Sequence, residues 1–275
     1  MKILIADEAG FCFGVKRAAE MVLTHSKNRE KINTLGPLIH NNQFTKHLEE
    51  RNVFSVGGVK EIDAEKVVIR SHGIPKDAEK KLRKKGFNIL DATCPFVKRV
   101  HRLAESLEQE GYKVLIFGEK DHPEVVGIKS YSRRPIVVKD IKSLPKLSRE
   151  EKVALISQTT QNLKLFEDLA NYLKNNCKYV RIHNTICDAT EKRQLSAKDL
   201  AQKVDLMIII GGRHSSNTAR LYEVCSKIVK SHHIETPIEL KKNWFRKAEK
   251  VGITAGASTP DFIIEDVVLK IKSYE

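Results

Sequence analysis

Three of the five cysteines are each followed by a basic pair: Cys12 by Lys16-Arg17, Cys94 by Lys98-Arg99 and, one residue further along, Cys187 by Lys192-Arg193. A short apolar run precedes each of these thiols, and a stretch with helical periodicity follows it. The N-terminus of a helix stabilises a thiolate because its amide groups are unpaired and its dipole is positive there. The three thiols are therefore candidate ligands or nucleophiles.

Polar residues recur at fixed distances from these thiols. A glycine lies 24 residues after each one (Gly36, Gly118, Gly211), a polar residue 28 after (His40, His122, Ser215), and another 30 after (Asn42, Glu124, Asn217). A second polar loop follows at a growing distance, with His72, Thr159 and Ser258 as its corresponding residues. Three unrelated loops do not keep such a register, so we expect three copies of one supersecondary unit.

The elements that position these loops alternate between strands and helices. Apolar runs predict strands at 32–35, 67–70, 87–90, 114–117, 136–138, 153–156, 179–182, 206–210 and 251–254, and helices at 14–27, 96–111, 161–175, 195–204 and after Pro260. This alternation predicts α/β domains with mostly parallel sheets, whose loops lie at the edge where ligands bind. We expect domains at 12–93, 94–186 and 187–275, and the strand within 1–11 completes the third.

Composition narrows the class of protein. The chain has 275 residues, of which 41% are hydrophobic, and no apolar run approaches the roughly 20 residues that span a bilayer. The first residues lead into a strand and do not read as a signal peptide, so we expect a cytoplasmic protein without a membrane partner. Five cysteines without close pairs indicate thiols, not disulfides. Cys177 and Cys225 lie outside the repeat and are predicted to be structural.

The charge is strongly basic, with 49 Lys and Arg against 35 Asp and Glu, a formal net charge of +14. Such a protein attracts nucleic acid, phosphorylated metabolites or an acidic protein partner. Nucleic acid is disfavoured because aromatic residues make up only 6% and no basic stripe contains them. Most of the lysines, such as Lys80 and Lys81, are predicted to form a solvated surface.

Threefold packing of the units would place the three thiols and the polar loop residues around one cavity. Structural zinc is disfavoured because the sequence lacks a Cys-x-x-Cys pair, whereas catalytic zinc remains open. An iron-sulfur cluster held by three thiols leaves one iron for substrate. The alternative, three buried cysteines of a repeat, fits less well with their position at polar strand ends. Hydroxyls, amides and imidazoles around the cavity suit a phosphate or diphosphate.

Specific motifs resemble one family along essentially the whole chain. They are Gly10-Phe11-Cys12-Phe13-Gly14-Val15, Ile39-His40-Asn41, Arg70-Ser71-His72-Gly73, Asp91-Ala92-Thr93-Cys94-Pro95, His122-Pro123-Glu124-Val125, Ser157-Gln158-Thr159-Thr160, Asn184-Thr185-Ile186-Cys187 and Ser215-Ser216-Asn217-Thr218. With them the sequence resembles the LytB family, the 4-hydroxy-3-methylbut-2-enyl diphosphate reductases of the non-mevalonate isoprenoid pathway. The resemblance implies a cloverleaf of three α/β domains around a 4Fe-4S cluster.

The resemblance also implies the role of each residue. The cluster would be held by Cys12, Cys94 and Cys187, with one iron not ligated by protein, and the alcohol of the substrate would bind that iron. The allylic diphosphate would be held by His40, His72, His122, Ser215, Ser216, Asn217 and Ser258. Glu124, Thr159 and His122 are the catalytic candidates, and the basic charge suggests an acidic electron donor such as ferredoxin or flavodoxin. Asp121 stands where the family commonly has glycine, and we expect it to face solvent.

Glu124 breaks the pattern of the repeat, because the other two copies carry the amides Asn42 and Asn217 at this position. Only a carboxyl can also exchange a proton, which points to chemistry and not packing alone. An anionic cluster and a diphosphate nearby would raise the pKa of Glu124. The alternative is that Glu124 caps the helix after Pro123.

Overall fold

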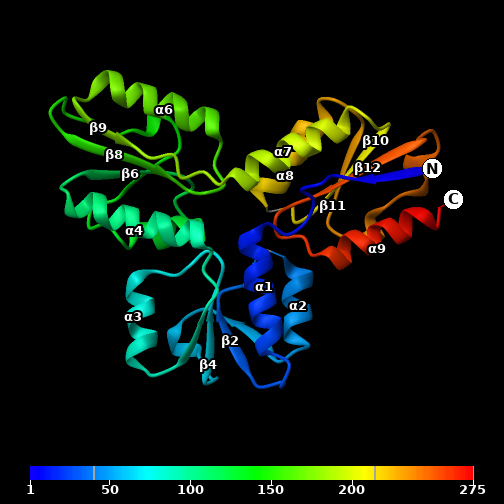
Figure 1. Cartoon of the computed structure of the whole chain (residues 1–275), viewed down its shortest axis with the longest axis horizontal. Coiled ribbons are helices and arrows are strands. Elements are labelled where there is room, and N and C mark those ends of the chain that lie inside the picture. The colour runs from blue at the N-terminus through cyan, green and yellow to red at the C-terminus, as the bar shows by residue number, and fades with distance from the viewer. Residues whose placement is uncertain (40, 214, 275) are drawn as a thin grey trace. The chain divides into compact units, whose positions relative to one another are not determined.

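The computed structural model describes residues 1–39, 41–213 and 215–274, and only the backbone at Ser216 (Figure 1). Within these residues twelve strands form three four-stranded sheets. The first sheet contains β2 (Ile32–Leu35), β3 (Val53–Val56), β4 (Lys66–Ile69) and β5 (Asn88–Asp91); the second, β6 (Lys113–Phe117), β7 (Ile136–Val138), β8 (Lys152–Ser157) and β9 (Tyr179–Ile182); the third, β1 (Lys2–Ile5), β10 (Leu206–Ile210), β11 (Ser231–Ile234) and β12 (Lys250–Ala255).

The three sheets share one strand order. They run β3-β2-β4-β5, β7-β6-β8-β9 and β11-β10-β12-β1, and each pairing in the described chain is parallel. In the third sheet β1 takes the outer place that β5 and β9 hold in the others, with Lys2 opposite Lys250. The predicted α/β class with parallel sheets and a closing N-terminal strand is confirmed.

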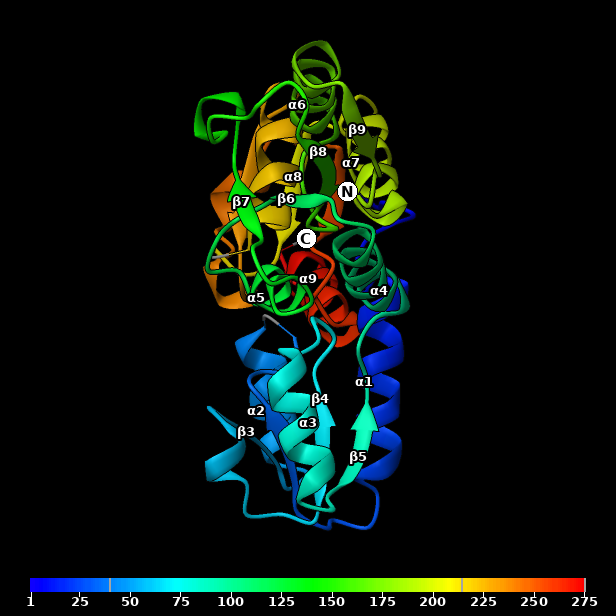
Figure 2. The ribbon, with the colours of Figure 1, turned by 90° about the vertical axis from the view of Figure 1, so that its left-hand side faces the viewer.

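Helices connect the strands. They are α1 (Phe13–His25), α2 (Asn42–Glu49), α3 (Lys76–Lys84), α4 (Pro95–Gln109), α5 (Pro123–Lys129), α6 (Leu163–Asn176), α7 (Asp188–Ala201), α8 (Ser216–Ser226) and α9 (Asp261–Lys272), with 3-10 turns at Val59–Glu61, Ile141–Ser143, Pro237–Glu239 and Lys242–Phe245. Figure 2 shows α3 beside β4 and β5. The helix predicted at 195–204 extends instead from Asp188 to Ala201. Its first turns were missed because they are polar and show no apolar period before Leu195.

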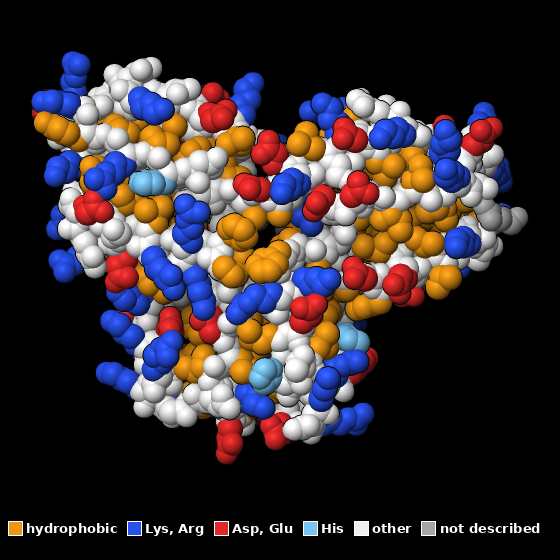
Figure 3. Space-filling view, in the orientation of Figure 1, with side chains coloured by type: hydrophobic (Ala, Val, Ile, Leu, Met, Phe, Trp, Pro, Cys, Tyr) orange, Lys and Arg blue, Asp and Glu red, His pale blue; other side chains and the backbone are white. Residues whose placement is uncertain are grey.

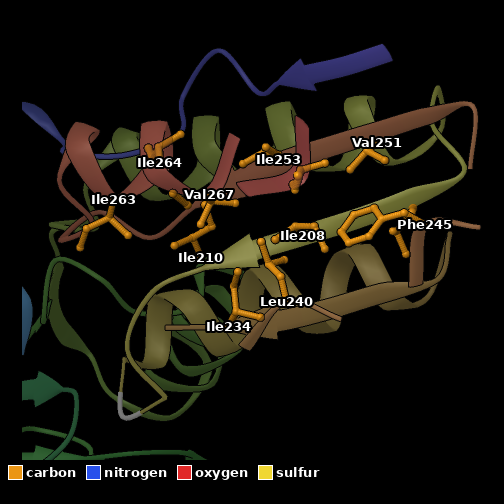
Figure 4. Close-up of a cluster of buried hydrophobic side chains, with 13 residues drawn as sticks. Ile208, Ile210, Ile234, Leu240, Phe245, Val251, Ile253, Ile263, Ile264 and Val267 are labelled. Carbon is orange, nitrogen blue, oxygen red and sulfur yellow. The ribbon is translucent and has the colours of Figure 1, made fainter. Parts of the chain in front are cut away.

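Helices cover both faces of the second sheet and both faces of the third. In β10, Leu206, Ile208 and Ile210 pack in the cluster that includes residues of α9 (Figure 4), whereas Met207 and Ile209 face α7 and α8. Neighbouring residues of a strand point to opposite faces, so a run without polar residues indicates a sheet buried on both sides. In the second sheet the two faces pack against α6 and against α4 with α5.

The three repeated glycines close equivalent turns. The N–H groups of Gly36, Gly118 and Gly211 each donate over 2.9 Å to the carbonyl of the last residue of the neighbouring edge strand, β3, β7 and β11. A Cβ at Gly118 would lie 2.9 Å from the side chain of Val125, and one at Gly211 would lie 2.6 Å from Thr218. Glycine is needed there because the loop packs directly against the following helix.

The chain divides into two compact units. One contains residues 1–19, 39–51 and 188–275, and the other contains residues 20–38 and 52–187. The predicted boundaries of three domains remain a prediction, although the three sheets follow them. None of the helices in the described ranges is long and apolar enough to cross a membrane.

Candidate active site

One hydrogen bond recurs at each of the three thiols. The backbone N–H of Cys94 donates to the carbonyl of Ser71 over 2.9 Å, that of Cys187 to Thr159 over 2.7 Å, and that of Cys12 to Ala257 over 3.3 Å. Each acceptor lies two residues after its strand ends. The backbone register therefore equates Thr159 with Ser71 and Ala257. The alignment of Thr159 with His72 and Ser258 was wrong by one residue, because it followed side-chain type.

Each repeated thiol is half-buried and directly precedes a helix, and Cys94 is the N-cap of α4. The other two cysteines differ. Cys177 and Cys225 are buried in the cores of the second and third sheets, and burial raises the pKa of the Cys225 thiol to about 11 and that of Cys177 above its ordinary value. Both fit the predicted structural role, because a thiol with a raised pKa is a poor source of thiolate.

Glu124 and Thr159 form a buried pair joined by two hydrogen bonds. The N–H of Thr159 donates to Oε1 of Glu124 over 2.7 Å, and the Thr159 hydroxyl donates to Oε2 over 2.8 Å. Glu124 is 1% exposed, and this burial raises its pKa to about 7 against the opposing effect of the Thr159 bonds. The direction matches the expectation, and within the protein the cause is the lost solvation of the carboxylate.

His122 is the N-cap of α5 and has a defined hydrogen-bond direction. Its Nδ1 accepts the backbone N–H of Glu124 over 3.2 Å, and a backbone amide can only donate. In the neutral ring the proton therefore resides on Nε2. The ring lies 5.6 Å from that of His72, nearly perpendicular to it. Nδ1 of His72 lies 3.4 Å from the hydroxyl of Ser71, which itself donates to the carbonyl of Leu38.

These contacts join two thiol loops without interruption. The backbone bond of Cys94 to Ser71, the two histidine rings, the Glu124–Thr159 pair and the backbone bond of Cys187 to Thr159 follow one another within a single unit. The structure therefore brings together six predicted site residues: Cys94, His72, His122, Glu124, Thr159 and Cys187. This arrangement can position an anion beside a buried proton donor.

The remaining predicted residues belong to the other unit. Ser215 is the N-cap of α8 and accepts the N–H of Thr218 over 3.3 Å. Both polar atoms of the Asn217 amide are buried, and neither has a hydrogen-bond partner among the residues that the structure describes. Ser258 follows the residue that accepts the N–H of Cys12. His40 and the Ser216 side chain lie outside the described residues.

His101 is a buried polar residue that the sequence analysis did not single out. This side chain is 5% exposed, stacks on Tyr131 with 4.5 Å between ring centroids, and lies where a Cβ on Gly73 would approach it to 2.8 Å. Burial lowers the pKa of His101 to about 4, so the ring is neutral near neutral pH. The available signal was a polar residue on the apolar face of α4, beside Val97, Val100 and Ala104. Asp121 is exposed, as expected.

Comparison with known proteins assigns the family. The family model of the LytB protein matches residues 3–272. The chain belongs to the LytB family. Two relatives carry the name 4-hydroxy-3-methylbut-2-enyl diphosphate reductase. The one from Aquifex aeolicus is 46% identical over 98% of this chain and 96% of its own length, and the one from Wolinella succinogenes is 46% identical over 100% of both.

Two solved structures are similar to this LytB chain. One is (E)-4-hydroxy-3-methyl-but-2-enyl diphosphate reductase, the terminal enzyme of the non-mevalonate pathway, with a TM-score of 0.80, 46% identity, and coverage of 99% of this chain and 100% of that one. The other is the E-1-hydroxy-2-methyl-but-2-enyl-4-diphosphate reductase from Plasmodium falciparum, with a TM-score of 0.87, 25% identity, and coverage of 98% and 87%.

Proposed function

We propose that this LytB chain reduces 4-hydroxy-3-methylbut-2-enyl diphosphate to isopentenyl and dimethylallyl diphosphate in the cytoplasm, the last step of the non-mevalonate isoprenoid pathway. The observation that carries the mechanism is the buried Glu124–Thr159 pair, which lies between the two histidines and the backbone of Cys187. In the reaction the bond from carbon to the hydroxyl breaks. Two electrons and two protons enter, one proton leaves as part of water, and the other is gained by carbon.

Cys12, Cys94 and Cys187 would hold a 4Fe-4S cluster with one iron not ligated by protein. Their chemistry fits this group, because soft thiolates suit iron-sulfur clusters and each thiol directly precedes a helix N-terminus that favours negative charge. When bound, such a cluster would relay electrons from an external donor to the substrate, and the iron not ligated by protein would act as a Lewis acid toward the substrate alcohol. The protein's own residues hold the substrate and deliver the proton.

The diphosphate would be held by neutral and basic donors from the loops. His122 can donate through Nε2, because its Nδ1 already accepts the N–H of Glu124. The Asn217 amide has no partner within the described residues and can donate to a phosphate oxygen, which would satisfy a buried group that otherwise lowers stability. His72, Ser258 and Ser215 complete the proposed site, together with His40 and Ser216.

The proton for the leaving hydroxyl would come from Glu124 through Thr159. Oε1 of Glu124 accepts the backbone N–H of Thr159, so a proton on the carboxyl resides on Oε2, facing the Thr159 hydroxyl. When Oε2–H donates to this hydroxyl, the hydroxyl hydrogen can point to the substrate. With a pKa of about 7, Glu124 is partly protonated at neutral pH. His122 holds the backbone of Glu124 in this geometry.

Anaerobic purification tests this proposal directly. The wild-type protein should contain iron and sulfide and should form both products from the substrate with a chemical reductant. Cys12→Ser, Cys94→Ser and Cys187→Ser should each lose the cluster because a hard serine oxygen replaces a soft thiolate. Cys177→Ser and Cys225→Ser are the matched controls and should retain it. Full iron content in any of the first three variants would refute the ligand assignment.

An acidic protein is the proposed electron donor. The chain carries a formal net charge of +14, and Lys and Arg side chains are spread widely over the face shown in Figure 3. Electrostatic steering of an acidic partner such as ferredoxin or flavodoxin weakens as salt screens the charges. Turnover with the protein donor should therefore fall with ionic strength, whereas turnover with a small chemical reductant should change little. Equal responses would reject docking by charge.

A further inference from the structure

The basic pairs that follow the three thiols have different environments. Arg99 is exposed and Arg17 is half-buried, whereas Arg193 is 2% exposed and is the largest fully buried side chain of the described chain. A guanidinium stays charged in a protein, and burying it is unfavourable unless its N–H groups are bonded. The groups that accept hydrogen bonds from Arg193 therefore indicate the role of this buried guanidinium.

The guanidinium of Arg193 donates to carbonyls of the loop before Cys12. Nε donates to the carbonyl of Glu8 over 2.8 Å, and Nη2 donates to that of Gly10 over 2.9 Å. Nη1 lies 3.4 Å from the carbonyl of Ala189, one turn earlier in α7. The planar fork thus connects α7, which begins directly after Cys187, with the segment between β1 and α1.

This segment has little regular structure of its own. Residues 6–12 form neither helix nor strand, and the N–H of Ala9 makes a turn bond to Ala6 over 3.0 Å. Gly10 has a φ of +91°, in the left-handed region, and a Cβ there would lie 3.2 Å from the carboxylate of Asp261. The hydrogen bond from the backbone N–H of Cys12 to the carbonyl of Ala257, at 3.3 Å, is longer than the equivalent backbone bonds of Cys94 and Cys187. Ala6 and Phe11 are held by other contacts, whereas the two Arg193 bonds hold the backbone at Glu8 and Gly10, just before Cys12.

We infer that Arg193 is a positioning residue that holds the Cys12 loop in the conformation needed for cluster binding. The inference rests on the proposed role of Cys12 as a ligand. Hydrogen bonds from a charged donor are stronger than neutral ones, and two of them on alternate carbonyls restrict the loop in both position and direction. Lysine cannot replace arginine here, because an ammonium carries no planar fork.

Alkylation of the thiols in the cluster-free full-length chain tests the inference. Iodoacetamide labelling at each cysteine, followed by mass spectrometry, compares Cys12 with Cys94 and Cys187 in the same molecule. In Arg193→Gln the rate of Cys12 alkylation should rise about tenfold relative to that of Cys94. The loop can then open without the cost of breaking the two charge-assisted hydrogen bonds from Arg193. Arg193→Lys should give a smaller rise. Arg99→Gln, the exposed equivalent in the second repeat, should leave all three rates unchanged.

The outcomes separate the inference from its premise. An unchanged ratio of Cys12 to Cys94 labelling in Arg193→Gln, with a native circular dichroism spectrum, would refute the positioning role, and so would an equal rise at all three thiols. If Arg193→Gln does not fold, the same ratio in Arg193→Lys decides. In the loaded enzyme Arg193→Gln should also release iron to a chelator several-fold faster. A loosened Cys12 with unchanged iron retention would instead refute Cys12 as a ligand.

Discussion

The helices α5 and α8 begin alike but carry different side chains at their second residue. Each follows an N-cap side chain, His122 or Ser215, that accepts a backbone N–H. In α5 the second residue is Glu124, whose two carboxylate oxygens both accept hydrogen bonds from Thr159. In α8 it is Asn217, whose amide nitrogen and oxygen are buried without a partner among the described residues.

This difference shows how one backbone plan serves two purposes. The repeat sets the position, and the residue type sets the role. Glu124 is enclosed by the protein, and burial raises its pKa to about 7, so it can hold a proton at neutral pH. Asn217 cannot titrate, but its amide can still donate to and accept from a ligand. The account therefore predicts that changes at Glu124 lower kcat, whereas changes at Asn217 raise KM.

The largest effect is expected from Glu124→Gln. This variant keeps the size and the hydrogen-bonding capacity but lacks the proton, and a positioned acid contributes about 10²–10⁴ to a rate. We expect normal iron content and a kcat lowered by about 10² or more. Rate and iron should be measured on the same anaerobic preparation. Near-normal turnover with full iron would remove Glu124 from the mechanism and leave the helix-capping role.

The second effect concerns substrate binding by Asn217. Asn217→Ala removes a hydrogen bond to a charged group, and KM should rise about tenfold or more with little change in kcat. Asn217→Asp should raise KM further, because a carboxylate faces the diphosphate. Steady-state kinetics with both variants measure this. A fall in kcat at constant KM would contradict the contrast with Glu124.

A smaller effect on rate is expected from Thr159. Thr159→Val keeps the shape but removes the hydroxyl that bonds Oε2 of Glu124. Because the backbone N–H of residue 159 still bonds Oε1, the carboxyl should stay in place, and kcat should fall about tenfold. Thr159→Ser retains the hydroxyl and is the matched control. Equal activity of the valine and serine variants would exclude transfer of the proton through this group.

The smallest effect is on stability. The pKa of Glu124 is raised from 4.5 to about 7 in the folded protein, so its protonated form stabilises the fold fully below pH 4.5. That contribution, on the order of 3 kcal/mol, is lost as the pH rises to about 7. Glu124→Gln should therefore unfold at a higher temperature than wild type at pH 8 and at a similar one at pH 5. Asn217→Ala is the control, and its offset from wild type should be the same at both pH values.

Much of the fold could be predicted from the sequence. Apolar runs of β10 and β12 indicated buried parallel strands, and the constant distance from thiol to glycine revealed the repeat before any element was assigned. The strand β11 could not be predicted, because Ser231-His232-His233-Ile234 is largely polar and its pairing with β10 is a tertiary contact. The strand β3 was also missed, although three of its four residues, Val53, Phe54 and Val56, are apolar.

The site was harder to predict than the fold. Glu124 could be recognised because it differs in type from Asn217 at the same repeat position. Its hydrogen bonds to Thr159 could not be predicted, because they join the start of α5 to the loop after β8, which is far away in the sequence. The burial of Arg193 could not be predicted either, because it depends on how the loop before Cys12 folds against α7. The sequence shows which residue types occupy the repeat positions, but it does not show how deeply each side chain is buried or what it contacts.

The protonation state of Glu124 tests the central claim most directly. Infrared difference spectra of wild type minus Glu124→Gln, recorded on the full-length protein across a pH series, isolate the carbonyl stretch of this one carboxylic acid. The account predicts that the band is present at pH 6 and loses half its amplitude near pH 7, in line with the raised pKa. A band that has already disappeared at pH 6, as for an ordinary glutamate with a pKa of about 4.3, would contradict it.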